Sequence, residues 1–314
     1  MKKETGFFTS SDKTTEIAYY IYSPETPVAI IQISHGMCEY IERYESHAQR
    51  FTEQGFILCG NDHKGHGNSA KASDELGYTG SADTLVDDVH LMTELVREKY
   101  PDLPVILLGH SMGSFVAREY MSRYHGSADA FIISGTAGPE NPTSLGKLVC
   151  KLVGAFKGER HRSKLLFLLA NGSYDKHFKK EARCSWLTHD TEITERYTKD
   201  PFCAFIFTVN GYYNMFDLLS RVSKKTWADT VEKDKPVLII SGDEDPVGNF
   251  GEGVRKVFSR IVGAEVSSVR CEIYEGGRHE LFNESPEIKE KAFSDVIDFV
   301  NEVKEKFVSG GTEA

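Results

Sequence analysis

Short apolar runs alternate with longer amphipathic runs along most of this 314-residue chain, and this order restricts the fold more than any other feature. The apolar runs occupy residues 28–34, 56–61, 105–109, 130–134, 237–241 and 268–274. Continuous apolar runs of this length are typical of strands buried on both faces of a parallel sheet. The runs with helical spacing of apolar residues occupy residues 44–54, 84–100, 115–124 and 253–262. We therefore expect an α/β fold with a mostly parallel central sheet flanked by helices.

The alternation stops between about residues 139 and 230. This stretch begins with Pro139 and Pro142, contains apolar runs with helical spacing such as residues 165–170, and offers no convincing strand. We predict that residues 139–230 form a helical cap, or lid, inserted into one core. That core comprises residues 1–138 and 231–314, and one core carrying an insertion suits a chain of this length.

Composition excludes several classes of protein. The chain has 40% hydrophobic and 27% charged residues, which is ordinary for a globular protein, and its net charge of −10 argues against general nucleic-acid binding. The N-terminus lacks the apolar core of a signal peptide, and no stretch approaches ~20 apolar residues. Six scattered cysteines without a C-x-x-C pair fit neither a zinc site nor a disulfide framework. We expect a cytoplasmic protein, while its oligomeric state is not indicated.

Residues 105–115 place a serine between a predicted strand and a predicted helix. The pattern G-x-S-x-G runs from Gly109 to Gly113, directly after the apolar residues of the strand. In this context a serine lies on a strained turn that lifts its hydroxyl above the sheet. We predict that Ser111 is a catalytic nucleophile; the alternative is a glycine-rich connection between strand and helix.

Only one histidine, His279, lies late enough in the chain to act as the base for Ser111. A serine hydroxyl needs a base, and the base needs an anionic partner that fixes its tautomer. Hydrolases with a strand–turn–helix serine carry serine, acid and histidine in that order along the chain. Ten of the 11 histidines lie at or before His189, whereas His279 directly follows the last predicted strand. We predict that His279 is the base; the alternative is a surface histidine.

Three consecutive carboxylates, Asp243, Glu244 and Asp245, follow the strand before the last one. Asp243 lies so close to the strand end that it is better placed to hold the turn. Asp245 is followed by Pro246, which biases it towards an extended backbone. We therefore predict Asp245 as the acid, with Asp243 and then Glu244 as the alternatives.

Two backbone amides are candidates for the oxyanion hole, which must stabilise the negative oxygen of a tetrahedral intermediate. One is Met112, directly after the predicted nucleophile. The other is Met37, in the loop after the first apolar run, where Gly36 allows a close approach of the backbone. The alternative for this loop is a plain turn at the end of a strand.

A second histidine-containing segment, residues 62–67 with the sequence D-H-K-G-H-G, could suggest a metal site. It lacks the glutamate of the H-E-x-x-H pattern and directly follows a strand, so a glycine-rich structural turn is the better interpretation. We expect neither a metal ion nor a cofactor.

The motifs together resemble those of the monoacylglycerol lipase and lysophospholipase group of α/β-hydrolases. They are H-G-x-x-E, D-H-x-G-H-G-x-S, G-H-S-M-G, a late G-x-x-D and a late histidine, found here at residues 35–39, 62–69, 109–113, 242–245 and 279. The resemblance extends from about residue 15 to 299. It implies the α/β-hydrolase fold and a serine carboxylester hydrolase that cleaves monoacylglycerols, lysophospholipids or similar small lipid esters through an acyl-enzyme.

One residue departs from the family pattern, because Tyr40 replaces the histidine that usually follows the H-G-x-x-E glutamate. This departure bears on substrate selection, and we expect Tyr40 and the cap residue Phe205 to contact the substrate. The segments 185–190 and 200–205 resemble bacterial members of the group. The same triad could instead cleave an amide or a thioester, and the fold could also belong to a catalytically silent ligand-binding protein.

The cap also carries a basic, apolar segment. Residues 147–164 contain six basic residues and one acidic residue, Glu159, and on a helix Leu148, Leu152 and Ala155 share one face. This face could rest transiently on a membrane surface, with the basic residues at lipid head groups. Alternatively, the segment is a solvated cap helix whose apolar face covers the active site. We further expect apolar cap residues to line a tunnel for the acyl chain, namely Leu165, Leu166, Phe167, Phe205 and Phe207.

Overall fold

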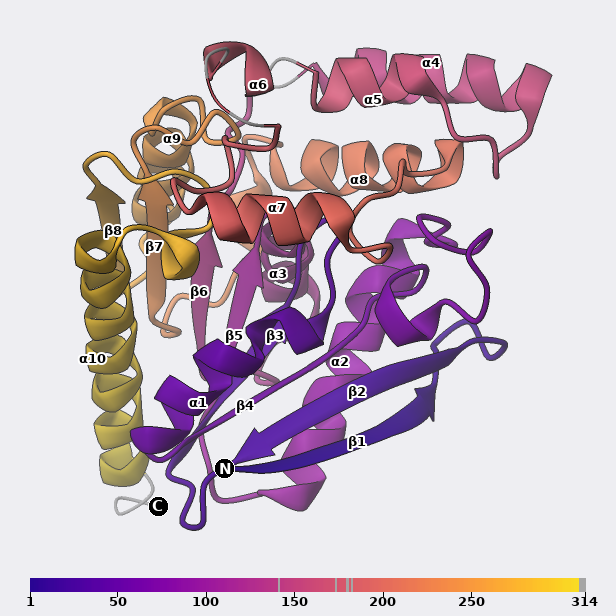
Figure 1. Ribbon diagram of the computed structural model, residues 1–314. Helices are drawn as coiled ribbons and strands as arrows, with labels where there is room; N and C mark the ends of the chain where they lie inside the picture. Colours follow the sequence, from indigo (N-terminus) through magenta and orange to yellow (C-terminus); the bar gives the residue numbers. More distant parts are fainter. Residues whose placement is uncertain (141, 173, 179–180, 182, 311–314) are drawn as a thin grey trace.

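An eight-stranded sheet forms the centre of the computed structural model, which describes residues 1–140, 142–172, 174–178, 181 and 183–310 (Figure 1). The strands are β1 (Lys2–Thr9), β2 (Glu16–Ser23), β3 (Ala29–Ser34), β4 (Phe56–Asn61), β5 (Val105–His110), β6 (Ala130–Ser134), β7 (Val237–Gly242) and β8 (Val269–Tyr274). Their order across the sheet is β1-β2-β4-β3-β5-β6-β7-β8. The strands β3 to β8 are parallel to one another, which confirms the expected parallel sheet.

The first two strands, β1 and β2, were not expected from the sequence. They form an antiparallel hairpin, and β2 pairs antiparallel with β4. Side chains of β1 alternate between exposed and partly buried positions, whereas every residue of β3, β4, β5, β6 and β7 is buried. The sequence analysis used continuous apolar runs to recognise strands, so the half-exposed β1 escaped it, whereas the apolar run of β2 at residues 17–22 was overlooked.

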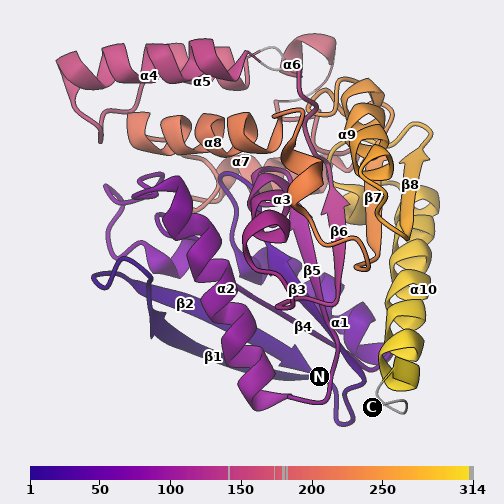
Figure 2. The ribbon, with the colours of Figure 1, turned by 180° about the vertical axis from the view of Figure 1, so that it is seen from behind.

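Helices cover both faces of the sheet (Figures 1 and 2). One face packs on α1 (Glu45–Glu53) and α10 (Pro286–Gly310), which contribute Phe51 and Phe293 to its apolar layer. The other face packs on α2 (Ala82–Lys99), α3 (Met112–Arg123) and α9 (Glu252–Gly263). The helices bury the parallel strands on both faces. The residues that directly follow the carboxyl ends of these strands are therefore held in fixed positions.

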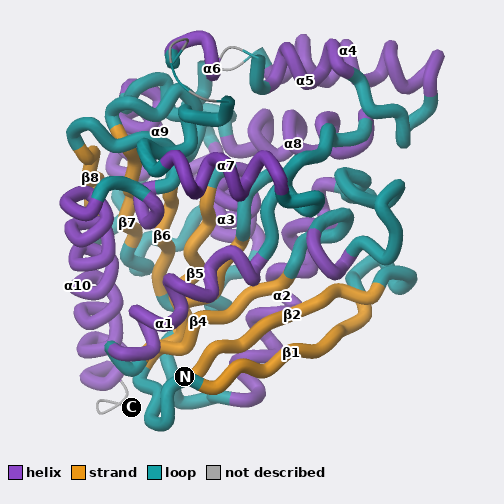
Figure 3. The backbone as a smooth tube through the Cα atoms, viewed as in Figure 1, coloured by secondary structure: helices purple, strands orange, loops and turns teal. Residues whose placement is uncertain are grey.

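The helices between β6 and β7 lie beyond the carboxyl ends of the parallel strands, and we call them the cap helices. They are α4 (Thr143–Lys157), α5 (Lys164–Ala170), α6 (Tyr174–His177), α7 (Thr191–Lys199) and α8 (Val209–Val222). Short 3-10 turns follow β3, β4 and β8, at η1 (Ile41–Tyr44), η2 (Gly67–Ser69) and η4 (Leu281–Asn283), and η3 (Trp227–Thr230) lies between α8 and β7. Figure 3 shows loops gathering between the strand ends and the cap helices. None of the helices in the described ranges is long and apolar enough to cross a membrane.

Candidate active site

Ser111 lies on the sharp turn that joins β5 to α3. Its φ of +53° is in the left-handed region, which non-glycine residues rarely adopt. Its N–H donates to the Ser134 carbonyl at 2.9 Å, which anchors the turn to the neighbouring strand β6. A side chain at Gly113 would overlap the backbone of Ser34, and one at Gly109 would overlap that of Gly113. The two glycines therefore allow the strand and the helix to meet closely enough to present Ser111 above the sheet.

His279 and Asp245 lie in contact at the ends of neighbouring strands. Asp245 follows β7, His279 follows β8, and His279 Nδ1 is 2.8 Å from Asp245 Oδ2. Both side chains are essentially inaccessible to solvent, and Asp245 Oδ1 accepts a hydrogen bond from the Val247 N–H at 2.9 Å. His279 Nε2 is buried and has no hydrogen-bond partner among the described residues. The imidazole is thus held by Nδ1, while Nε2 is left for another group.

The pKa of His279 reflects two opposed effects. Burial favours the neutral imidazole and by itself lowers the pKa, but the negative charge and hydrogen bond of Asp245 raise it, helped by Glu280 and Glu39. The net direction is upwards from the ordinary value. A carboxylate beside a buried imidazole therefore makes it a stronger base towards a proton at Nε2.

The other two carboxylates of the 243–245 run have different partners. Asp243 Oδ1 accepts a hydrogen bond from the Gly276 N–H at 2.7 Å, which ties the turn after β7 to the turn after β8. Glu244 lies near the surface, where its Oε2 is 3.4 Å from Arg278 Nε. The structure therefore brings Asp245, and not its two neighbours, to His279.

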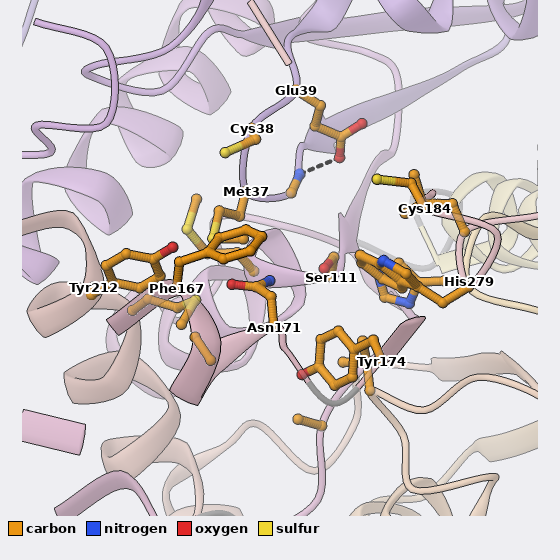
Figure 4. Close-up of a pocket in the computed structure, with 18 of the residues that line it drawn as sticks. Met37, Cys38, Glu39, Ser111, Phe167, Asn171, Tyr174, Cys184, Tyr212 and His279 are labelled. Carbon is orange, nitrogen blue, oxygen red and sulfur yellow. Dashed lines mark hydrogen bonds between the residues drawn. The ribbon is translucent and has the colours of Figure 1, made fainter. Parts of the chain in front are cut away.

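The loop after β3 brings a second backbone amide towards Ser111. A side chain at Gly36 would come within 2.9 Å of Ser111 Cβ, so the loop passes directly beside the serine. The Gly36 N–H donates to Glu39 Oε1, the dashed contact in Figure 4, which fixes the loop. Within the described ranges, the N–H groups of Met37 and Met112 have no hydrogen-bond partner. Both residues line the cavity that contains Ser111, so their amides are available to an oxyanion.

Arg43, which the sequence analysis did not identify, connects the Met37 loop with the His279 loop. Its guanidinium donates to Glu39 Oε2 at 2.7 Å and to Glu280 Oε2 at 3.0 Å. Glu280 is the residue after His279, and both carboxylates are buried. This ion-pair network holds the candidate oxyanion loop and the candidate base in fixed relative positions.

The histidines of residues 62–67 pack together beneath the Met37 loop. The ring centroids of His35 and His63 are 4.3 Å apart, and those of His35 and His66 are 5.1 Å apart. His35 bridges Gly36 and His63, because its Nδ1 lies 2.8 Å from the Gly36 carbonyl and its Nε2 accepts from the His63 N–H at 2.9 Å. In the part of the chain that the structure describes, no three His, Cys, Asp or Glu side chains are arranged to hold a metal ion.

A segment of the cap, residues 185–189, runs along the His279 loop. The Glu280 N–H donates to the Leu187 carbonyl at 2.7 Å, and the Trp186 ring lies 5.0 Å from the His279 ring. The buried Arg278 donates to the Ser185 carbonyl at 2.8 Å and pairs with Glu181. Sequence reasoning did not foresee this contact, which supports the imidazole from the cap side.

An apolar cavity of about 220 Å³ lies between the strand ends and the cap helices (Figure 4). Ser111 and His279 line it together with Met37 and Met112. Most of the wall is apolar and comes from the cap helices and α3. Members of this wall include Phe115, Phe167, Phe205, Tyr212, Phe216 and Leu219.

The residues expected to contact substrate differ in their positions. Phe167 and Phe205 line the cavity, whereas Leu166 and Phe207 are fully buried in the core and Leu165 is 54% exposed. Tyr40 is absent from the described residues that line the cavity. Its hydroxyl donates to Asp200 Oδ2 at 2.7 Å, at the end of α7. Tyr40 therefore connects the core with the cap helices beside the cavity.

The chain is similar to lipases along most of its length. A monoacylglycerol lipase from Mycolicibacterium smegmatis is 29% identical over 278 residues, which cover 87% of this chain and 89% of that protein. The human monoglyceride lipase is 26% identical over 281 residues, with 88% and 84% covered.

A solved structure and a family comparison lead to the same group. The thermostable carboxyl esterase from Bacillus coagulans, solved in complex with glycerol, matches with a TM-score of 0.89 and 29% identity, covering 97% of this chain and 99% of that one. The sequence model of the family described as "Serine aminopeptidase, S33" matches residues 25–286, well over half of the chain. This protein therefore belongs to that family of α/β-hydrolases.

Proposed function

We propose that this protein hydrolyses carboxylic esters of the monoacylglycerol, lysophospholipid or similar small lipid type, with Ser111, His279 and Asp245 as its catalytic triad. One observation carries the proposal. His279 is held at Nδ1 by Asp245, its buried Nε2 has no partner among the described residues, and the residue lines an apolar cavity together with Ser111. A base oriented in this way beside a serine on a strained turn is suited to nucleophilic acyl transfer.

In the first half of the reaction, Ser111 Oγ attacks the ester carbonyl while His279 Nε2 takes the hydroxyl proton. The carbonyl oxygen becomes an oxyanion, which the Met37 and Met112 amides stabilise. Asp245 remains ionised and stabilises the imidazolium. When the intermediate collapses, the bond to the alcohol oxygen breaks, His279 returns the proton to that oxygen, and the acyl chain stays on Ser111.

In the second half, a water molecule replaces the alcohol. His279 Nε2 removes a proton from the water as it attacks the acyl carbonyl, and the same two amides stabilise the second oxyanion. Collapse breaks the bond to Ser111 Oγ, which recovers its proton from His279. The products are a fatty acid and an alcohol, and the enzyme returns to its starting state.

The lining of the cavity favours a lipid ester over a peptide. An aminopeptidase must bind a substrate ammonium group, for which a free carboxylate is the natural partner. Of the carboxylates that line the cavity, Glu39 and Glu280 are both paired with Arg43, and Asp175 accepts a hydrogen bond from the Cys184 N–H at 3.0 Å. The apolar wall matches an acyl chain, and the similar proteins named as monoacylglycerol and monoglyceride lipases support the same substrate class.

A substrate panel tests the proposal. We expect hydrolysis of monooctanoylglycerol and of octanoyl lysophosphatidylcholine, and little or no hydrolysis of aminoacyl p-nitroanilides. A fluorophosphonate probe should label the native protein at Ser111 and should not label the Ser111→Ala variant. Efficient anilide cleavage with negligible ester cleavage would make the protein an amidase, and an unlabelled native protein would make it a silent binding protein.

The outer surface of α4 and α5 suggests how the enzyme reaches lipid substrates. We propose that residues 139–230 act as a cap that docks transiently on an anionic lipid surface. Leu148, Leu152 and Phe156 follow one another along α4, and all are more than half exposed, with Phe156 at 84%. Their exposure supports docking over the alternative in which that face only covers the active site. Lys151, Lys157 and Lys164 on the same two helices are also exposed, so an apolar strip lies among cations.

The cavity lining reaches this outer surface. Leu145 on α4 and Leu169 on α5 both line the cavity, yet each is more than half exposed. A lipid could therefore pass from a docked surface into the cavity along apolar side chains. The other partner chemistry, an apolar protein surface, would not require the neighbouring lysines.

Sedimentation with lipid vesicles tests this docking. The protein should bind vesicles of phosphatidylcholine with phosphatidylglycerol more tightly than vesicles of phosphatidylcholine alone, and salt should weaken the difference. The Phe156→Ser variant should bind roughly tenfold more weakly, because a buried aromatic ring is lost from the contact. Phe7→Ser is the matched control, since Phe7 is 59% exposed on β1, far from α4 (Figure 1). Equal loss in both variants would contradict the proposal.

A further inference from the structure

The side chain of Asn171 presents an unusual polar group to the cavity. Asn171 is the residue directly after α5, and it lines the cavity that Ser111 and His279 also line. Figure 4 shows its carboxamide in the cavity between the rings of Phe167 and Tyr174. Its Oδ1 atom is buried and has no hydrogen-bond partner among the residues that the structure describes.

The backbone holds this carboxamide in place. The Asn171 N–H donates to the Phe167 carbonyl at 2.8 Å, and the Asn171 carbonyl accepts from the Tyr174 N–H at 3.1 Å. Both backbone groups are thus engaged in the turn that ends α5. The side chain is therefore presented from a fixed turn, as a group that recognises a ligand should be.

A buried acceptor without a partner calls for an explanation, because nearly all buried polar groups in native proteins are hydrogen-bonded. The surrounding wall is mostly apolar, and its described residues provide no donor to Oδ1. An apolar residue such as leucine would fill a similar volume without leaving an amide oxygen unpaired. The missing donor is therefore best supplied by the substrate.

The chemistry of the substrate limits which part can donate. An amide oxygen needs an O–H or N–H partner. A saturated acyl chain and an ester group have no such hydrogen, so in a monoacylglycerol only the two free hydroxyls of glycerol qualify. An ethyl ester of the same fatty acid has none.

We propose that Asn171 accepts a hydrogen bond from a free glycerol hydroxyl of the substrate and so makes the enzyme prefer esters of hydroxylated alcohols. This inference rests on the proposed ester hydrolase function and adds a specificity-determining residue to it. The contact selects the alcohol part of the ester, whereas the apolar wall accepts the acyl part. Sites that hydrogen-bond a substrate hydroxyl discriminate strongly against analogues that lack it, because their own polar group is then left unpaired.

Two esters with the same acyl chain test the inference. We compare kcat/KM for monooctanoylglycerol and ethyl octanoate, both as monomers in solution, in the native protein and in the Asn171→Leu variant. The native protein should prefer the glycerol ester. Asn171→Leu should lower kcat/KM for the glycerol ester about tenfold and change that for the ethyl ester less than twofold. Retained activity on the ethyl ester shows that the variant is folded.

Two further variants separate the lost hydrogen bond from a change of shape. Asn171→Asp keeps an acceptor oxygen, and it should keep the preference for the glycerol ester even if the added charge slows both reactions. Phe167→Leu alters the apolar wall beside Asn171, and it should affect both esters by the same factor. If Asn171→Leu lowers both rates equally, the inference is wrong while the ester hydrolase function stands. If the native protein cleaves neither ester, the proposed function itself fails and the inference falls with it.

Discussion

Two carboxylates only two residues apart, Asp243 and Asp245, should differ sharply in their importance for catalysis. Asp245 contacts His279 Nδ1 at 2.8 Å, whereas Asp243 accepts a hydrogen bond from the Gly276 N–H. Asp245→Asn should lower kcat on the order of 10⁴-fold, because the amide favours the wrong imidazole tautomer and cannot stabilise the imidazolium. Asp243→Asn should lower kcat less than tenfold, since it removes only a turn contact of about 1 kcal/mol.

Steady-state kinetics on p-nitrophenyl butyrate measures both variants, and circular dichroism checks that each is folded. Ser111→Ala, which should lose on the order of 10⁵-fold or more, sets the lower limit of the assay. If Asp243→Asn were the more damaging variant, the acid would have to be reassigned to Asp243.

The activity of the enzyme should fall at acidic pH with a midpoint above the ordinary histidine pKa of about 6.5. In the proposed mechanism, only the neutral imidazole of His279 accepts the serine proton, and the protonated form dominates below its pKa. Burial opposes the charged form, but Asp245 outweighs it and raises the pKa of His279. Asp245→Asn should therefore move the acidic midpoint of kcat/KM to lower pH, as it removes the charge that holds the proton.

A pH profile of kcat/KM between about pH 4.5 and 9 would measure this, because that range brackets the ordinary histidine pKa. Asp243→Asn is the control, and its midpoint should match that of the native protein. A native midpoint below the ordinary value, or one that Asp245→Asn leaves unmoved, would show that another group controls the acidic limb.

Some residues of the site could be chosen from the sequence, and others could not. Ser111, Asp245 and His279 could be chosen because each follows a recognisable strand, and parallel strands end at the same edge of the sheet. Arg43 could not, because its partner Glu280 lies 237 positions away and nothing local indicates the pairing. Asn171 could not be chosen from the sequence either. Its proposed role rests on a buried Oδ1 without a hydrogen-bond partner among the described residues, and only the packing of the folded chain reveals this.

At the scale of elements, the pairing of residues 185–189 with the His279 loop makes part of the cap a support for the proposed catalytic base. Arg278 is central to this pairing, since its guanidinium bonds to the Ser185 carbonyl and to Glu181. Arg278→Met should lower kcat roughly tenfold with little change in KM, because a small displacement of the imidazole weakens proton transfer.

The matched control is Arg270→Met, which removes a surface ion pair with Glu302 and should change neither kcat nor Tm appreciably. Measurements of kcat, KM and Tm for both variants test this prediction. If Arg278→Met changed KM alone, the segment would shape the substrate site and would not support His279.

The elements β1 and α10 escaped prediction for different reasons. The strand β1 alternates exposed and partly buried residues, and α10 carries charged residues along most of its exposed side. The strand β1 lacks the continuous apolar run that identified the buried strands. For α10 a signal was present, because Pro286 occupies its first position and Phe293, Val296 and Val300 recur at helical spacing.

At the scale of the whole molecule, charge and apolar surface are distributed unevenly. The chain has a net charge of −10, yet the outermost cap helices carry exposed lysines and leucines together. In the proposed docking, we expect repulsion from an anionic surface to orient the molecule with these helices towards the lipid. The same helices line the cavity, so the orientation that favours docking also brings the cavity to its substrate.

The length of the preferred acyl chain follows from the size and lining of that cavity. It has a volume of about 220 Å³ and a mostly apolar wall that reaches from Ser111 to Leu145 and Leu169 at the outer surface. Each buried methylene stabilises the complex by about 0.8 kcal/mol, so two added carbons should raise kcat/KM roughly tenfold until the cavity is full. We therefore expect a preference for medium or longer acyl chains, measured with p-nitrophenyl esters from acetate upwards below their micellar concentrations.

A variant that shortens the cavity tests the cause of this preference. Phe167→Trp adds volume to the apolar wall, so it should lower kcat/KM for the longer esters and leave the acetate ester unchanged. The optimum should therefore move to shorter chains, whereas a change at Phe7, which lies outside the cavity, should not move it. A steady fall in kcat/KM from acetate onwards in the native protein would mean that the apolar cap residues pack the core and hold no acyl chain, and the preference for lipid esters would then have to come from the docking surface alone.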